Sequence, residues 1–246
     1  MMLSFQSSSW ADIDALRQRI MGAAAESVEE SAQTFADELA NRYSTVVLAR
    51  VFLVLPFASL LAGDRVAATA LANEDSGLTA KTPVLTLLGT AGREPEWKNR
   101  KRSAGHRAIP LLSSAHVQGI PMLAKLLADL EVNLAGLDDG KPIATRRMLG
   151  GRNCAFFVPD ALTSQDDAGR HIIPARDFVQ NNGIRTVFGM GGAYADGTLA
   201  AAVVFTSEAI DRAIVDRFPS VISNFKMATA TLLSACHIYR DADARD

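Results

Sequence analysis

The glycine-rich stretch Gly189-Met190-Gly191-Gly192 is the first place in this sequence where chemistry could occur, because closely spaced glycines often surround a phosphate. A dinucleotide-binding loop needs the spacing G-x-G-x-x-G between a strand and a helix. Here the third glycine position is Tyr194, and an Asp-Gly turn signal and a second strand follow instead of a helix. No Gly-Lys-Ser/Thr triplet occurs in the chain. The stretch therefore predicts a strand with a bulge, or one that a ligand or another backbone approaches closely.

Four histidines are the next candidates: His106, His116, His171 and His237. The sequence contains neither H-E-x-x-H nor C-x-x-C, so a metal site would have to be assembled from distant segments. His106 and His116 flank an expected strand–helix turn, and His171 lies in a loop expected to overhang a pocket. Ligation of haem or a metal by one of them stays open, against a surface or core role for each.

The polar segment 93–107 gathers Lys and Arg residues around Trp97. Basic side chains beside an aromatic ring can bind single-stranded nucleic acid, but one short patch on a chain of net charge −2 favours a solvated loop. A second interpretation is an anionic or carboxylate ligand held by Arg107 or Arg185, because a guanidinium offers paired donors. Trp97 would then be a lid or wall.

The residues carry no enzyme signature. The Ser and Cys residues lack a nucleophile elbow or a base at a recognisable spacing. Asp166-Asp167 precedes Gly169-Arg170-His171, which suits acid–base catalysis, but an exposed charged loop explains it as well. The sequence therefore favours a non-enzymatic protein and keeps an enzyme as the alternative.

The elements that must position these residues follow from the periodicity of apolar residues. Residues 10–42 predict one long helix, because Ser9 and Asp12 resemble a capping box and a narrow apolar stripe follows. That stripe suits packing against one other helix, either in a homodimer or on the protein's own domain. Pro121 either kinks the helix over 113–130 or begins it. Strands are predicted at 45–55, 83–92, 108–112, 154–159, 184–190 and 199–205, further helices at 65–74, 113–130, 175–183, 207–217 and 219–239, and a loop at 138–152.

The composition is that of an ordinary globular protein, with 246 residues, of which 48% are apolar and 21% charged. Cys154 and Cys236 lie far apart, which fits a reducing cytoplasm better than a disulfide framework. The N-terminus lacks the pattern of a signal peptide. The most membrane-like segment, 45–62, contains Arg50 and Pro56, and its Val and Phe residues favour a buried strand over a membrane span.

The order of elements over 171–238 resembles the C-terminal half of a GAF domain. A helix stop precedes "NGIRTVFGMGG", an Asp-Gly hairpin leads to "TLAAAVVFTSE", and a long final helix follows. The stretches "EPEWKNRKRSAGHRAIPL" and "GRHIIPARDFVQNNGIR" are similar to GAF-like sensor modules found ahead of bacterial histidine kinases. The resemblance covers roughly residues 40–238.

The resemblance implies an α/β (α+β) fold, a GAF/PAS-like antiparallel sheet of about six strands with long N- and C-terminal helices on one face and a small-molecule pocket on the other. It implies an N-terminal dimerisation and signalling helix (1–43), a sensor domain (44–239) and a polar tail (240–246). The implied function is a cytoplasmic regulatory domain that senses a small molecule and acts, as a homodimer through its outer helices, on a histidine kinase or another signalling partner.

The family binds cyclic nucleotides, tetrapyrroles, haem or small metabolites, so the resemblance does not identify the ligand, and a small metabolite or a tetrapyrrole such as haem stays open. Cys236-His237 lies near the end of the last helix, a poor position for bilin attachment. The alternatives are an enzyme using His106 or His171 as its base, and a ligand-free dimeric scaffold. The residues expected at the pocket are Trp97, His106, Arg107, Phe156, His171, Arg185, Phe188, Met190 and Gly191.

Overall fold

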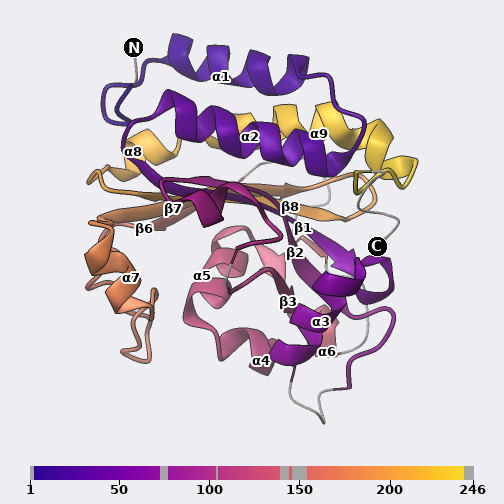
Figure 1. Ribbon diagram of the computed structural model, residues 1–246. Helices are drawn as coiled ribbons and strands as arrows, with labels where there is room; N and C mark the ends of the chain where they lie inside the picture. Colours follow the sequence, from indigo (N-terminus) through magenta and orange to yellow (C-terminus); the bar gives the residue numbers. More distant parts are fainter. Residues whose placement is uncertain (1–2, 73–76, 104, 139–143, 146–153, 241–246) are drawn as a thin grey trace.

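A computed structural model describes residues 3–72, 77–103, 105–138, 144–145 and 154–240 of the chain. Its centre is a six-stranded antiparallel sheet with the strand order β3-β2-β1-β8-β7-β6. The helices α1, α2 and α9 cover one face of this sheet and form the helical layer, while shorter helices and loops cover the other, lower face (Figure 1). The expected α/β fold with an antiparallel sheet of about six strands is therefore confirmed.

The strands are β1 (Val46–Pro56), β2 (Pro83–Gly92), β3 (Ala108–Pro110), β4 (Val132–Asn133), β5 (Ala144–Thr145), β6 (Cys154–Val158), β7 (Thr186–Ala193) and β8 (Leu199–Thr206). The α-helices are α1 (Trp10–Gly22), α2 (Val28–Arg42), α3 (Ala62–Leu71), α4 (Ser114–Gln118), α5 (Pro121–Asp129), α6 (Ala135–Asp138), α7 (Arg176–Asn181), α8 (Arg212–Val215) and α9 (Pro219–Ser234). Two short 3-10 helices, η1 (Phe57–Ser59) and η2 (Pro95–Lys98), complete the set, and β4 pairs with β5 outside the main sheet.

The single helix expected over 10–42 is wrong, because the chain forms two helices there. The capping box of Ser9 and Asp12 begins α1 as expected. A second helix start follows at Ser27, whose side chain accepts a hydrogen bond from the amide of Glu30. Because this cap needs an extended backbone at Ser27, the helix cannot run through that position.

The apolar stripe of α1 is buried inside the chain. Ile13, Leu16 and Ile20 are at most 1% exposed and belong to the core between the sheet and the helical layer. Below α1, the rings of Phe35 in α2 and Phe225 in α9 meet edge to face, with 5.7 Å between centroids. The stripe therefore packs on the protein's own domain, which is one of the two arrangements that its width allows.

The contact between α2 and β2 is close enough to require glycine. A Cβ atom on Gly89 would lie 2.1 Å from the carbonyl oxygen of Ala32. One residue further along, the side-chain amide of Gln33 donates to the carbonyl of Thr90 at 2.8 Å and accepts from its amide at 3.2 Å. The helix thus rests on the strand backbone itself.

The glycines of β7 serve a similar close approach. A Cβ atom on Gly191 would lie 2.5 Å from Cδ1 of Leu130, the residue that ends α5. On the same lower face, a Cβ on Gly189 would lie 3.4 Å from the ring of Phe156 and 2.5 Å from the carbonyl of Ala202. Close approach, one of the two roles predicted for these glycines, is the one that the structure has.

The C-terminal helices are shorter than expected. The helix expected over 207–217 is reduced to α8, and the helix expected over 219–239 ends at Ser234. Cys236 has a φ of 59°, so the chain turns there instead of continuing the helix. Within 113–130, Pro121 begins α5 and separates it from α4, as one of its two predicted roles requires.

The remaining expectations are met in part. Each predicted strand forms, and the segment 45–62 contains β1 rather than a spanning helix. Across the ranges that the structure describes, no helix combines the length and apolar character needed to cross a membrane. Most of the loop expected at 138–152, and the tail beyond residue 240, lie outside the described residues.

Candidate ligand-binding site

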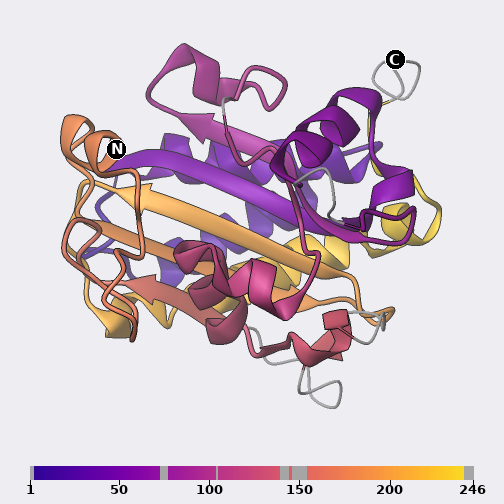
Figure 2. The same cartoon turned by 90° about the horizontal axis from the view of Figure 1, so that it is seen from below.

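A cavity of about 80 Å³ lies between the lower face of the sheet and α5. Figure 2 shows this side of the molecule, with α5 (pink) in front of the central strands. The cavity is lined by Arg50, Phe52, Leu85, His106, Ile109, Ile120, Met122, Leu123, Leu126, Val203 and Phe205. Its wall is therefore mostly apolar, with a single guanidinium and a single imidazole among the described lining residues.

Arg50 reaches the cavity because side chains alternate along β1. Its neighbours on that face, Leu48 and Phe52, belong to the lower core, whereas Ala49 and Val51 belong to the core under the helical layer. The bulge between Val51 and Phe52 shifts the pairing of β1 with β2 directly beside this site. The sheet thus presents one charged side chain to a cavity wall that is mostly apolar.

The guanidinium of Arg50 is only partly satisfied by the protein. Nη2 donates to Oγ of Ser103 at 2.6 Å, and Nη1 lies 3.4 Å from the carbonyl oxygen of Gly105. Its Nε is buried and has no hydrogen-bond partner among the described residues. Burial lowers the pKa of Arg50 to about 10. None of the ion pairs within the described part of the chain includes Arg50, so its charge has no counter-ion there.

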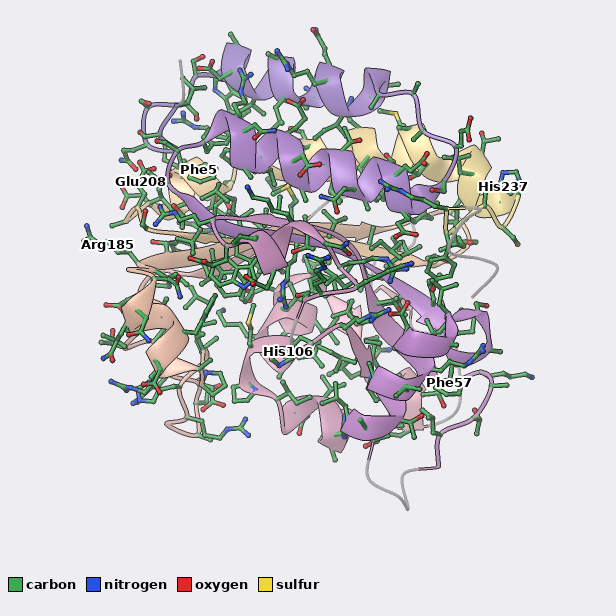
Figure 3. The ribbon with its side chains drawn as sticks, in the orientation of Figure 1. Phe5, Phe57, His106, Arg185, Glu208 and His237 are labelled. Atoms are coloured by element: carbon green, nitrogen blue, oxygen red, sulfur yellow. The ribbon has the colours of Figure 1, made fainter. Side chains whose placement is uncertain are left out.

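His106 lies beside Arg50 on a turn with unusual backbone geometry. Gly105 has a φ of 70° and His106 a φ of 52°, so two successive residues are left-handed. This conformation is rare for a residue with a side chain and often occurs at functional sites. Protein atoms around the ring exclude water from its charged form, which lowers the pKa of His106, and the positive charge of Arg50 lowers it further. Figure 3 shows His106 beneath the sheet, among the elements of the lower layer.

A buried ion-pair network holds residues 99–103 and 105–107, the described part of the segment 99–107, to which His106 belongs. Arg100 is 3% exposed, and its Nε lies 2.6 Å from Oε1 of Glu29 in α2 while Nη1 lies 2.9 Å from Oδ2 of Asp64 in α3. Arg107 binds the other oxygen of Asp64 at 2.5 Å. The guanidinium of Arg100 also lies 5.3 Å from the ring centroid of Tyr239. The segment therefore connects the cavity to α2 and to the C-terminal end of the described chain.

The expected pocket residues divide between the cavity and other places. His106 lines the cavity. Trp97 does not line the cavity but is separated from it by the ring of Phe178. The rings of Trp97 and Phe178 meet edge to face with 5.6 Å between centroids, and Phe178 packs in the same way on the lining residue Phe205. Arg107 is engaged by Asp64 and does not line the cavity.

Four of the expected residues lie on β6 and β7, outside the cavity. Phe188 and Met190 face the helical layer, on the opposite side of the sheet. Phe156 is fully buried in the lower core, and Gly191 faces Leu130. For Phe156 and Gly191 the reason is the strand order: β8 separates β7 from β1, so their part of the lower face lies over the end of α5 and not over the cavity.

His171 and Arg185 also lie away from the cavity. Nε2 of His171 is 2.7 Å from Nη1 of Arg176, at the start of α7. Arg185 is exposed directly before β7, at one end of that strand, and lies apart from His106 in Figure 3. An enzyme in this cavity would therefore have to use His106, and not His171, as its base.

Among the described lining residues the expected set contains His106 alone, and the charged one that it lacks is Arg50. Its sequence signal is a lone charge in the apolar strand "VVLARVFLVL", which argues against a membrane span but equally indicates a buried charged group. Within the described ranges, no group of three or more His, Cys, Asp or Glu side chains is arranged to hold a metal ion.

Solved structures with a similar fold span almost the whole chain. Free methionine-R-sulfoxide reductase from Neisseria meningitidis, solved with its substrate, is 11% identical at a TM-score of 0.50, covering 96% of this chain and 99% of that one. A GAF domain of a phosphoenolpyruvate-protein phosphotransferase from Coxiella burnetii is 13% identical at 0.49, covering 93% and 99%. A phycocyanobilin-bound GAF domain of a cyanobacterial phytochrome is 10% identical at 0.48, covering 94% and 99%. No family model and no curated protein sequence matches the chain.

The chain thus has a GAF-like fold, which confirms the resemblance seen in its sequence. At these identities the similarity concerns the fold alone. The ligand and the role of the cavity have to be argued from this chain's own residues.

Proposed function

We propose that this chain is a regulatory domain that senses a small molecule in the cavity between the sheet and α5. The observation that carries the proposal is the guanidinium of Arg50, which lies in an apolar wall without a counter-ion among the described residues. An apolar pocket with a few polar groups is the usual form of a small-molecule site. The similar fold of the Neisseria reductase was solved with a bound substrate, which supports a small molecule as occupant.

The segment 99–107 is the proposed route by which the ligand acts on the rest of the protein. At one end Ser103 accepts a hydrogen bond from Arg50, and at the other Arg100 pairs with Glu29 at the start of α2. A ligand that binds Arg50 competes with Ser103 and so favours a different position of this segment. The ligand shifts the population between the two positions of the segment only as far as its affinity for the protein differs between them.

The proposed output is a contact made by the outer helices in the cytoplasm, in a homodimer or with a histidine kinase or another signalling protein. We assign the dimerisation and signalling role to residues 1–43, the sensor to 44–239 and a polar tail to 240–246. Met21 and Met227 support a contact here, because both are about half exposed, and Met21 touches Asn224, one turn before Met227.

Native mass spectrometry of the protein purified from cells tests the sensor. We expect a bound small molecule in the wild type and none in Val203→Phe, which fills the cavity. Hydrogen exchange should then differ between the two proteins at 99–107 and at the start of α2. A protein that carries no ligand and shows no such difference would be a scaffold and not a sensor.

Light scattering tests the output. The wild type should be a dimer, and Met21→Glu together with Met227→Glu should make it monomeric without unfolding it. A monomeric wild type at micromolar concentration would exclude the homodimer and leave a separate signalling protein as the partner.

A further inference from the structure

The apolar wall of the cavity favours a ligand whose surface is mostly hydrocarbon. Apart from Arg50 and His106, every described lining residue is aliphatic, aromatic or methionine. A strongly hydrated molecule would lose its water there without gaining hydrogen bonds in return. An occupant with apolar surface instead gains from leaving water. Most of the bound molecule must therefore be hydrocarbon.

The donors of Arg50 select for one planar anion. A guanidinium carries five N–H donors. Two of those of Arg50 are used, because Ser103 and Gly105 each accept one hydrogen bond from it. The buried Nε has no partner among the described residues, so at least one donor of this guanidinium is not used by them. The planar donors of a guanidinium match the two oxygens of a carboxylate. A phosphate dianion would bring a second charge, and the described wall offers one guanidinium and an imidazole with a lowered pKa.

The volume limits the length of the molecule. On this measure one water needs about 10 to 15 Å³, so a cavity of about 80 Å³ holds about five to eight non-hydrogen atoms. A straight-chain monocarboxylate of about four to six carbons has this number of atoms. Longer chains would have to displace α5 or extend into solvent.

We infer that the ligand of this cavity is a short aliphatic monocarboxylate, with its carboxylate on the guanidinium of Arg50 and its chain between Val203 and Leu126. This inference rests on the proposed sensing function and specifies its ligand class. His106 lies at the carboxylate end of the cavity, next to Arg50.

Isothermal titration calorimetry on the full chain tests the inference with butyrate, pentanoate, hexanoate and decanoate, each compared with its primary amide at constant ionic strength. The amide keeps the size of the carboxylate and removes its charge. We expect the short carboxylates to bind and their amides to bind at least about tenfold more weakly. Decanoate should bind more weakly than hexanoate because the cavity is too short for it.

Substitutions of Arg50 then assign the charge. Arg50→Gln should weaken carboxylate binding about ten- to a hundredfold, and Arg50→Lys should weaken it less. The control Arg19→Gln removes an arginine that is exposed on α1 and should change nothing. A melting curve for each variant shows whether it is folded.

Equal affinity for carboxylates and amides, or undiminished binding by Arg50→Gln, would overturn the inference. So would the absence of binding in both series. In that last case native mass spectrometry separates the two proposals. A cell-derived molecule that is absent from Val203→Phe would keep the sensing function with another class of ligand, and its absence from the wild type would remove both.

Discussion

Replacing Arg50 with methionine is expected to stabilise the ligand-free protein. The pKa of Arg50 is lowered to about 10 by burial, which means that the folded state holds this proton less tightly than the unfolded chain. At neutral pH the charged form therefore destabilises the folded protein by about 3 kcal/mol. Methionine removes the charge and keeps an unbranched apolar chain in the wall.

The hydrogen bonds that are lost reduce this gain. Arg50 donates to Ser103 at 2.6 Å and weakly to Gly105 at 3.4 Å, which together contribute about 2 kcal/mol. The net increase in the free energy of unfolding is then about 1 kcal/mol, or about 2 to 4 °C in Tm for a domain of this size. Because the wild type loses the buried charge as Arg50 deprotonates, the difference should shrink as the pH rises through about 10.

Thermal and urea denaturation without ligand measure this difference, with Arg19→Met as the control. That control should change stability by less than about 0.5 kcal/mol because Arg19 is largely exposed. A stabilised Arg50→Met protein that no longer binds carboxylates is what a binding residue predicts, since function there opposes stability. A lower Tm for Arg50→Met would refute the reasoning and show that Arg50 mainly anchors the segment 99–107.

The remaining predictions concern stability and are measured by urea denaturation. Asp64→Asn removes the carboxylate shared by Arg100 and Arg107, and because their charges stay largely buried the protein should lose about 3 to 5 kcal/mol. A loss below about 1 kcal/mol, the size of a surface change, would contradict the network. Gly89→Ala should destabilise by about 3 kcal/mol, because its Cβ meets the backbone of α2, whereas the matched Gly22→Ala, with open space around it, should not. Gly191→Val should destabilise by about 1 to 3 kcal/mol by displacing Leu130, and it should leave carboxylate binding unchanged. Weaker binding in that last variant would show that β7 takes part in the site.

The sequence predicts the sheet well because each strand is an apolar run bounded by turn residues. "TVFGMGGA" and "LAAAVVFT" are joined by an Asp-Gly turn, and they pair as β7 and β8. The helix over 10–42 is a different case, since apolar spacing continues across the break. The break has a local signal in the sequence, because Ser27 followed by Glu30 has the spacing of a helix start, as Ser9 and Asp12 do.

The site is harder to predict because its position depends on the order of strands in space. The glycine spacing favours a site on β7, but β8 lies between β7 and the strand that carries Arg50. An anion held by a guanidinium was among the sequence interpretations, with Arg107 and Arg185 as its candidates. Arg107 is engaged by the buried carboxylate of Asp64, and the spacing of these residues in the sequence does not reveal this pairing.

Residues near the end of the described chain bind the free amides at the start of α2, near its beginning. The amides of Val28 and Glu29 donate to the carbonyls of His237 and Ile238, and the amide of Arg240 donates to the side chain of Glu29, 211 residues earlier. At translation rates of about 5 to 20 residues per second, the start of α2 waits roughly 10 to 40 s for these partners. The domain therefore cannot close cotranslationally in order from its N-terminus. The start of α2 should remain accessible to chaperones or proteases until residues 237–240 have left the ribosome.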